Sequence, residues 1–159
     1  MTKLYIRKNI NGIFYYKDPG MKILHREDGP AREWAEGHKE WYQNDEYHRL
    51  DGPAVEFANG DKEWWQNDKR HREDGPAIEY ANGSKEYYQN GKLHRLNGPA
   101  LEYANGDKFW YQNGKCHRLD GPAVEYVNGS QEYWYQGEEF SSIKTDEQWK
   151  KHLKWMKFE

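Results

Sequence analysis

Histidine and arginine side chains recur at one fixed spacing along this chain. Five His-Arg pairs follow one another at intervals of 23 residues, starting at His25, His48, His71, His94 and His117. Imidazole nitrogens bind zinc and guanidinium groups bind phosphates, so the two columns suggest a metal site or a nucleic-acid surface. However, a motif that occurs five times at a fixed spacing is more typical of a repeat architecture than of one active site.

The spacing argues against a shared metal ion. If each repeat adds two strands, neighbouring histidines lie about 10 Å apart. Zinc ligands lie about 2.0–2.1 Å from the ion, so two repeats cannot share one. We therefore expect no metal and no cofactor. We expect each ring to pack near the following proline, with one nitrogen bonded to a backbone group or to the nearby aspartate.

The arginine column also argues against nucleic acid. An aspartate follows each arginine by two positions, except that Asn97 follows Arg95, and the formal net charge of the chain is −3. Neutralised arginines bind phosphates weakly, and nucleic-acid proteins usually carry a basic surface. We expect Arg–Asp pairs that hold a bulge in place.

Pairs of aromatic residues occur once per repeat, for example Trp64-Trp65. Adjacent strand residues point to opposite faces, so one ring of each pair can face outward and recognise a partner. The alternative is that neighbouring side chains cover both faces. The first interpretation gives these candidate binding residues: Trp41, Trp64, Trp65, Trp110, Tyr111, Trp134, Arg49, Arg72, Arg95 and Arg118.

Cys116 is the one cysteine of the chain and excludes an intramolecular disulfide. It follows an aromatic run that starts at Phe109, where the other repeats have glutamate. No acid or base is placed to activate the thiol, because His117 is adjacent in sequence and so points elsewhere. A packed thiol is the ordinary role of such a residue. Because no phosphate-binding glycine loop or nucleophile elbow appears either, the sequence predicts no catalytic residues and a protein that is not an enzyme.

The elements that position these residues are strands. Each repeat holds two short aromatic-rich segments around an Asn-Gly turn, a strong hairpin signal. A three-residue loop at 58–60 sets Glu56 opposite Lys62, whereas a two-residue loop would set it opposite Glu63, so charge favours the longer loop. The same positions recur as Glu79 with Lys85 and Glu102 with Lys108. We expect an all-β, elongated meander of antiparallel hairpins, with five units of 23 residues and about two strands per unit.

The ends differ from the middle. We expect a partial repeat over 1–24, the five repeats over 25–139 and a C-terminal cap over 140–159, all in one domain. Thr145 to Gln148 predicts a capping box, and a helix over 145–157 would place Trp149, Leu153 and Met156 on one apolar face. The N-terminal edge, with Tyr5, Ile6 and Ile13, is open to pairing with a second chain, which predicts a homodimer.

Composition agrees with a thin repeat array. The mean hydropathy is −1.35, yet 16% of the 159 residues are aromatic, which disordered chains lack. No apolar run reaches the roughly 18 residues that span a bilayer. The N-terminus lacks the apolar stretch of a signal peptide. We expect a soluble, cytoplasmic protein that does not bind membranes.

The motif Tyr-x-Asn-Gly-Lys-x-His, then Gly and Glu-Tyr-x-x-Gly, resembles the MORN repeat. It is closer to the MORN-like repeats of bacterial, bacteriophage and giant-virus proteins. Segments 90–94 and 113–117 carry the resemblance best, and it covers about residues 12–139. Here Arg follows the histidine, where the family tends to have Gly. The resemblance implies a meandering sheet of hairpins, scaffolding, protein binding and self-association, and for some members contact with lipid headgroups.

These observations predict a non-enzymatic module that binds a protein partner. If the gene comes from a phage, the family's distribution sharpens this to an inhibitor of a host defence protein. The alternative function is a protein that binds or sequesters a small ligand or nucleotide among the arginine and aromatic residues of an irregular repeat.

Overall fold

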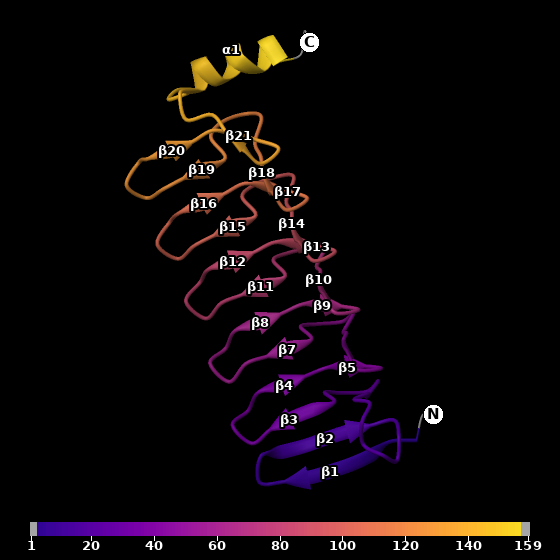
Figure 1. Ribbon diagram of the computed structural model, residues 1–159. Coiled ribbons are helices and arrows are strands. Elements are labelled where there is room, and N and C mark those ends of the chain that lie inside the picture. Colours follow the sequence, from indigo (N-terminus) through magenta and orange to yellow (C-terminus); the bar gives the residue numbers. More distant parts are fainter. Residues whose placement is uncertain (1–2, 157–159) are drawn as a thin grey trace. The chain divides into compact units, whose positions relative to one another are not determined.

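The computed structural model describes residues 3–156, and the chain divides into two compact units, residues 1–81 and 82–159. The outer bounds of the predicted caps, residues 1 and 159, and residue 157 of the predicted helix lie outside the described residues. Each unit consists of antiparallel hairpins that follow one another in chain order, and one helix follows the last hairpin (Figure 1). The predicted all-β meander with a C-terminal helix is therefore confirmed.

The first unit holds a main sheet in the order β1-β2-β3-β4-β7-β8-β11. β1 forms its edge. Its strands are β1 (Tyr5–Asn9), β2 (Gly12–Tyr16), β3 (Arg32–Trp34), β4 (Lys39–Glu40), β7 (Val55–Glu56), β8 (Lys62–Glu63) and β11 (Ile78–Glu79). Two side hairpins accompany it, formed by β5 (Tyr42–Gln43) with β6 (Glu46–Tyr47) and by β9 (Trp65–Gln66) with β10 (Lys69–Arg70).

The second unit repeats this plan with the order β12-β15-β16-β19-β20. Its main strands are β12 (Lys85–Glu86), β15 (Leu101–Glu102), β16 (Lys108–Phe109), β19 (Val124–Glu125) and β20 (Gln131–Glu132). Its side hairpins are β13 (Tyr88–Gln89) with β14 (Lys92–Leu93), β17 (Tyr111–Gln112) with β18 (Lys115–Cys116), and β21 (Trp134–Tyr135) with β22 (Glu138–Glu139).

The strand register of the main hairpins places oppositely charged side chains opposite each other. Glu56 lies opposite Lys62, and Glu102 lies opposite Lys108, as the sequence predicts. The N–H of Phe57 donates to the carbonyl of Asp61 at 2.9 Å, which encloses the predicted three-residue loop 58–60. Gly60 closes that loop with a φ of +97°, a conformation that favours glycine.

The prediction of about two strands per repeat was incomplete, because each repeat adds a second, smaller hairpin. The strand expected to continue through Trp110 breaks there. The N–H of Trp110 donates to Ala123 of the next main strand at 2.8 Å, while its carbonyl accepts from His117 of its own side hairpin at 2.9 Å. Pro122 has no N–H to extend the main ladder. Asn113 and Gly114 then turn the chain with φ of +52° and +81°, as a type I′ turn requires.

The core is a set of small clusters strung along the repeats. The alanine of each Gly-Pro-Ala segment is fully buried, and the aliphatic residue after it is nearly so in four repeats, as with Val55, Ile78, Leu101 and Val124. In the second unit Cys116, Ala123 and Val124 form one cluster, with Phe109 and Trp134 packed against it. Each repeat thus buries a few side chains against its neighbour within the unit.

The predicted C-terminal helix is confirmed as α1 (Asp146–Met156). Thr145 caps it, because its Oγ1 accepts from the N–H of Gln148 at 3.3 Å. The Gln148 side chain accepts from the N–H of Lys144 at 2.7 Å, one residue before the position expected of a capping box. Trp149 is fully buried against Tyr133 and Ile143, so α1 covers the end of the second unit's last repeat.

Candidate functional site

One face of each repeat carries an arginine whose guanidinium group lies over an aromatic ring. We call this the arginine face. The guanidinium carbon lies 3.8–4.1 Å from the ring centroid, close enough for a cation–π contact. The ring is the first aromatic of the pair, eight positions before the arginine, except that Arg26 stacks on Tyr15. The pairs are Arg26–Tyr15, Arg49–Trp41, Arg72–Trp64, Arg95–Tyr87 and Arg118–Trp110.

In four repeats the guanidinium group also donates hydrogen bonds from Nε and Nη1 within its own repeat. Arg49 donates from Nε to Asp51 at 2.8 Å, and from Nη1 to the carbonyl of Pro53 and to Glu56, both at 3.1 Å. The same three acceptors serve Arg26, Arg72 and Arg118. Gly52 belongs to this arrangement, because a Cβ there would lie 2.8 Å from the Arg49 guanidinium carbon. The expected Arg–Asp pairs are therefore confirmed in four repeats.

Repeat four departs from this pattern. Arg95 binds the carbonyl of Pro99 and the carboxylate of Glu102, but Asn97 stands where the other repeats have aspartate. In the complete repeats the hydrogen bond from arginine, and then its charge, hold the pKa of Asp28, Asp51 and Asp74 below the usual range. Since each guanidinium already faces one or two carboxylates, this column offers little unpaired positive charge to a phosphate.

The candidate binding residues divide between two faces. The arginine face holds seven of them: Trp41, Trp64 and Trp110, with Arg49, Arg72, Arg95 and Arg118. Trp65 lies beside Arg70 and Glu63, and Tyr111 and Trp134 line a separate cavity. We call this side of the repeats the reverse face. All six rings are half-buried, so neighbouring side chains partly cover both faces.

The most exposed apolar side chains of the arginine face occupy a position that the sequence did not single out. This is the variable residue of His-Arg-x-Asp, where Leu50, Leu96 and Leu119 are 75%, 69% and 48% exposed. Glutamate fills the same position at Glu27 and Glu73. The restriction of this position to leucine or glutamate was the available signal, and sequence reasoning treated the position as merely variable.

Two grooves flank Leu50 in the first unit, one repeat apart. One holds about 530 Å³ and is lined by Arg26, Pro30, Trp41, His48 and Leu50, among others. The other holds about 620 Å³ and is lined by Leu50, Pro53, Trp64, His71 and Arg72, among others. The equivalent residues of successive repeats thus build equivalent grooves, and the exposed leucine forms the ridge that they share.

Three histidines of the column bond to the backbone of a neighbouring turn. In three repeats Nδ1 accepts a backbone N–H nineteen residues further on, in the next side turn: His25 from Asn44 at 3.1 Å, His94 from Asn113 at 3.1 Å and His117 from Gln136 at 3.2 Å. The predicted bond to the backbone is therefore confirmed for these three. In residues 3–156 no group of three or more His, Cys, Asp or Glu side chains is arranged to hold a metal ion.

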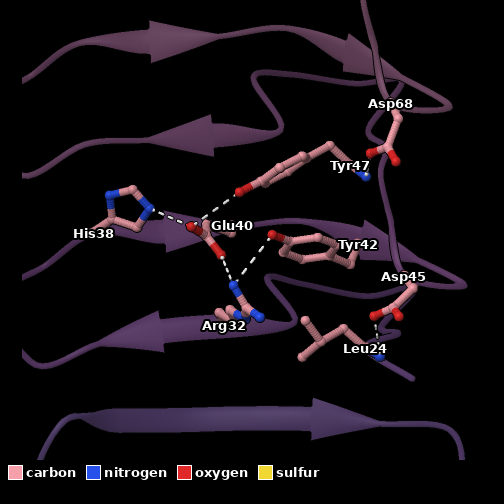
Figure 2. Close-up of polar contacts among 8 residues, drawn as sticks. All are labelled: Leu24, Arg32, His38, Glu40, Tyr42, Asp45, Tyr47 and Asp68. Carbon is pink, nitrogen blue, oxygen red and sulfur yellow. Dashed lines mark hydrogen bonds and ion pairs between the residues drawn. The ribbon is translucent and has the colours of Figure 1, made fainter. Parts of the chain in front are cut away.

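A buried charged cluster distinguishes the reverse face of the first repeat (Figure 2). Glu40, only 7% exposed, accepts from Arg32 at 3.1 Å and lies 2.9 Å from Nε2 of His38. The Tyr47 hydroxyl donates to the same carboxylate at 3.3 Å. Burial raises the pKa of the Tyr42 and Tyr47 hydroxyls, and the charge of Glu40 adds to the rise. Arg32 replaces the aliphatic residue of the other repeats, and its charge balances the buried Glu40.

A third cavity, of about 560 Å³, lies on the reverse face of the second unit. Phe109, Tyr111, Tyr126 and Trp134 line it, together with Cys116 and Glu132. Cys116 is 7% exposed, and burial, followed by the charge of Glu132, raises its thiol pKa to about 12. The thiol is therefore protonated near neutral pH and is a poor nucleophile.

Comparison of the sequence with models of known protein families found no match, and comparison with curated proteins found none. No helix within residues 3–156 has the length and apolar character that crossing a bilayer requires.

Proposed function

We propose that this chain is a non-enzymatic, MORN-like binding module whose arginine face receives an extended segment of a protein partner. The observation that carries the proposal is the pair of equivalent grooves on either side of Leu50. Tryptophan and arginine line both grooves, and these residue types are enriched at interface hot spots. Leu50, 75% exposed, adds an apolar side chain between them.

The spacing of the grooves suits an extended chain. Each repeat contributes two main-sheet strands, so successive grooves lie about 10 Å apart, which is roughly the length of three residues in a strand. Every third side chain of a strand points to the opposite face, whereas three residues of a polyproline II helix span about 9 Å and complete one turn. A partner segment in that extended conformation, with an apolar side chain at every third residue, would therefore meet equivalent surroundings in successive repeats. The paired Arg–Asp groups at the rim offer both donors and acceptors to its backbone.

The side chains that most resemble catalytic residues have other roles, which supports a binding rather than an enzymatic function. The Cys116 thiol stays protonated, and the Nδ1 atoms of His25, His94 and His117 accept backbone hydrogen bonds. A free thiol is compatible with a reducing compartment, so we place the protein in the cytoplasm.

Capture from host extract with matched variants tests the proposal. Leu50→Asp places a charge on the ridge between the grooves, and Ile10→Asp makes the same change at a side chain that is 94% exposed in the β1–β2 turn. We expect one protein to be retained by the wild type and by Ile10→Asp, and lost with Leu50→Asp. A partner that all three chains retain equally would contradict the proposed surface.

The identity of the captured protein decides the narrower hypothesis. A host defence protein, inhibited on binding by the wild type but not by Leu50→Asp, would make the module an inhibitor. Any other partner would leave the binding function in place and remove the inhibitory one.

A further inference from the structure

The reverse face of the first unit shows how this fold fills the space beside its carboxylates. In two repeats a glutamate of the main sheet and the aromatic residue two positions later share one guanidinium of the same chain. Arg32 lies 3.1 Å from Glu40 and 5.1 Å from the Tyr42 ring centroid. Arg70 lies 3.5 Å from Glu63 and 5.0 Å from the Trp65 ring centroid. A carboxylate, an aromatic ring and a guanidinium therefore form one unit of packing.

The last repeat keeps the carboxylate and the ring. Nε1 of Trp134 donates to Glu132 at 2.9 Å, just as Nε1 of Trp65 donates to Glu63 at 2.7 Å. The register identifies the two positions from which an arginine could reach this pair. Val124 lies opposite Glu132, as Arg32 lies opposite Glu40, and Glu139 lies opposite Trp134, as Arg70 lies opposite Trp65. Neither position holds a basic residue.

The cavity of about 560 Å³ lies at this place. Within residues 3–156 no basic side chain comes within ion-pair distance of Glu132, which bonds only to neutral donors, the Tyr126 hydroxyl at 3.1 Å and the Trp134 indole. After burial itself, the charge of Glu132 contributes to raising the pKa of Cys116 and Tyr126. Lys115 is the one basic residue of the lining, and its side chain is exposed.

Phe109 makes the walls of the cavity more aromatic. It stands where the first three repeats have Glu40, Glu63 and Glu86. Its ring meets Tyr103 and Tyr126 edge to face, with centroids 5.5 and 5.8 Å away. Four aromatic rings and one carboxylate without a cationic partner now surround one space. Such a lining attracts organic cations through ring faces and charge together.

We propose that this cavity binds a guanidinium group supplied from outside the chain, which pairs with Glu132 and packs on Trp134 as Arg70 packs on Trp65. The ligand class is a guanidine compound, either free or as an arginine side chain of another protein. The site lies on the reverse face of the second unit and does not depend on the partner proposed for the arginine face.

Calorimetric titration with two probes tests the proposal and separates the two sources. The probes are agmatine, a free guanidine, and the capped peptide acetyl-Gly-Arg-Gly-amide. The same peptide with citrulline in place of arginine has nearly the same shape without the charge. We expect the arginine peptide or agmatine to bind and the citrulline peptide not to bind. Binding of agmatine alone would identify a free ligand, and binding of the peptide would identify a side chain.

Three variants connect the binding to the cavity. Glu132→Gln keeps an acceptor for the Trp134 indole and presents an amide N–H from which the Tyr126 hydroxyl can accept, but it removes the charge. We expect about tenfold or greater loss of affinity, as for a charge-assisted hydrogen bond. Glu63→Gln is the matched control in a repeat whose guanidinium is already present, and it should bind as the wild type does. Val124→Arg places an arginine where Arg32 stands in the first repeat, and it should fill the cavity and abolish binding.

Several results would overturn the proposal. These are no binding of either charged probe to the wild type, equal binding of the citrulline peptide, or equal affinity of the wild type and Glu132→Gln. Circular dichroism and the urea midpoint of each variant identify any loss of binding that comes from unfolding. Lys115→Gln tests whether the ligand is positively charged, because removing the lysine charge from the rim should strengthen the binding of a cation.

Discussion

Replacing Trp149 by alanine should detach α1 from the second unit. Trp149 is fully buried, with ring centroids 5.7 Å from Tyr133 and 5.5 Å from Phe140. A helix of 11 residues is marginal by itself in water, so its docking depends on this contact. The change removes the largest side chain that joins the helix to the sheet.

The magnitude follows from the buried area. An aromatic side chain buries about 150–250 Å², and at about 25 cal/mol per Å² this gives about 4–6 kcal/mol as an upper bound. The indole N–H of Trp149 is buried without an acceptor within residues 3–156, and removing it recovers about 1–3 kcal/mol. We therefore expect a net loss of about 3 kcal/mol, at the lower end of the range for Trp→Ala substitutions in cores.

Hydrogen exchange and urea unfolding measure this loss, and the same helix supplies the control. Trp155 is 61% exposed, so Trp155→Ala should change stability by less than about 0.5 kcal/mol. In Trp149→Ala the amides of α1 and of Tyr133 should exchange rapidly, while those of β2 in the first unit keep their protection. Equal urea midpoints for the two variants would show that α1 is not held by its buried face.

Three further predictions concern single positions. Asn97→Asp should give Arg95 the partner that four other repeats have, adding about 0.2–1 kcal/mol. An aspartate whose pKa is lowered in the folded state stabilises the fold above its unfolded pKa, and this stabilisation is lost as the pH falls through the folded pKa. The urea midpoints of variant and wild type should therefore differ at neutral pH and converge below about pH 3. A difference that persists in this acidic range would show that the added stability has another cause. Cys116, with its pKa raised to about 12, should react with a disulfide reagent far more slowly in the folded chain than in urea at mildly alkaline pH, and equal rates would contradict its burial. The edge strand β1 should pair two chains, so Ile6→Lys should lower the sedimentation coefficient of concentrated protein, whereas a wild-type monomer at high concentration would remove the dimer.

The fold could be predicted from the repeat because its sequence signals are local and agree with one another. The Glu56–Lys62 register followed from charge, and the helix start at Thr145 followed from its cap. The break at Trp110 could not be predicted, because the alternation of residues continues through it and the partner that ends the strand, Ala123, belongs to the next repeat.

The candidate site was predicted only in part for the same reason. The pairing of arginine with an aspartate two positions later is visible in the sequence, whereas its stacking on a ring eight positions earlier depends on which face each side chain takes. In the sequence, the only sign of the charged cluster at Glu40 was Arg32 at a position that is aliphatic in other repeats. Arg32 lies opposite Glu40 on the neighbouring strand, so the ion pair could be recognised only once the strand register was known.

The bonds between repeats constrain how the gene can change. Asp45 accepts from the N–H of Leu24, and Asp68 accepts from the N–H of Tyr47, each across 21 residues (Figure 2). The loss of a single codon within a repeat would set each donor whose bond spans the deletion beside the wrong acceptor. The loss or gain of 69 nucleotides, the coding length of a 23-residue unit, would instead give every donor an equivalent acceptor at the new junction. Relatives of this gene should therefore differ in length by whole units, as unequal recombination between tandem copies would produce, and small insertions should be confined to the two ends.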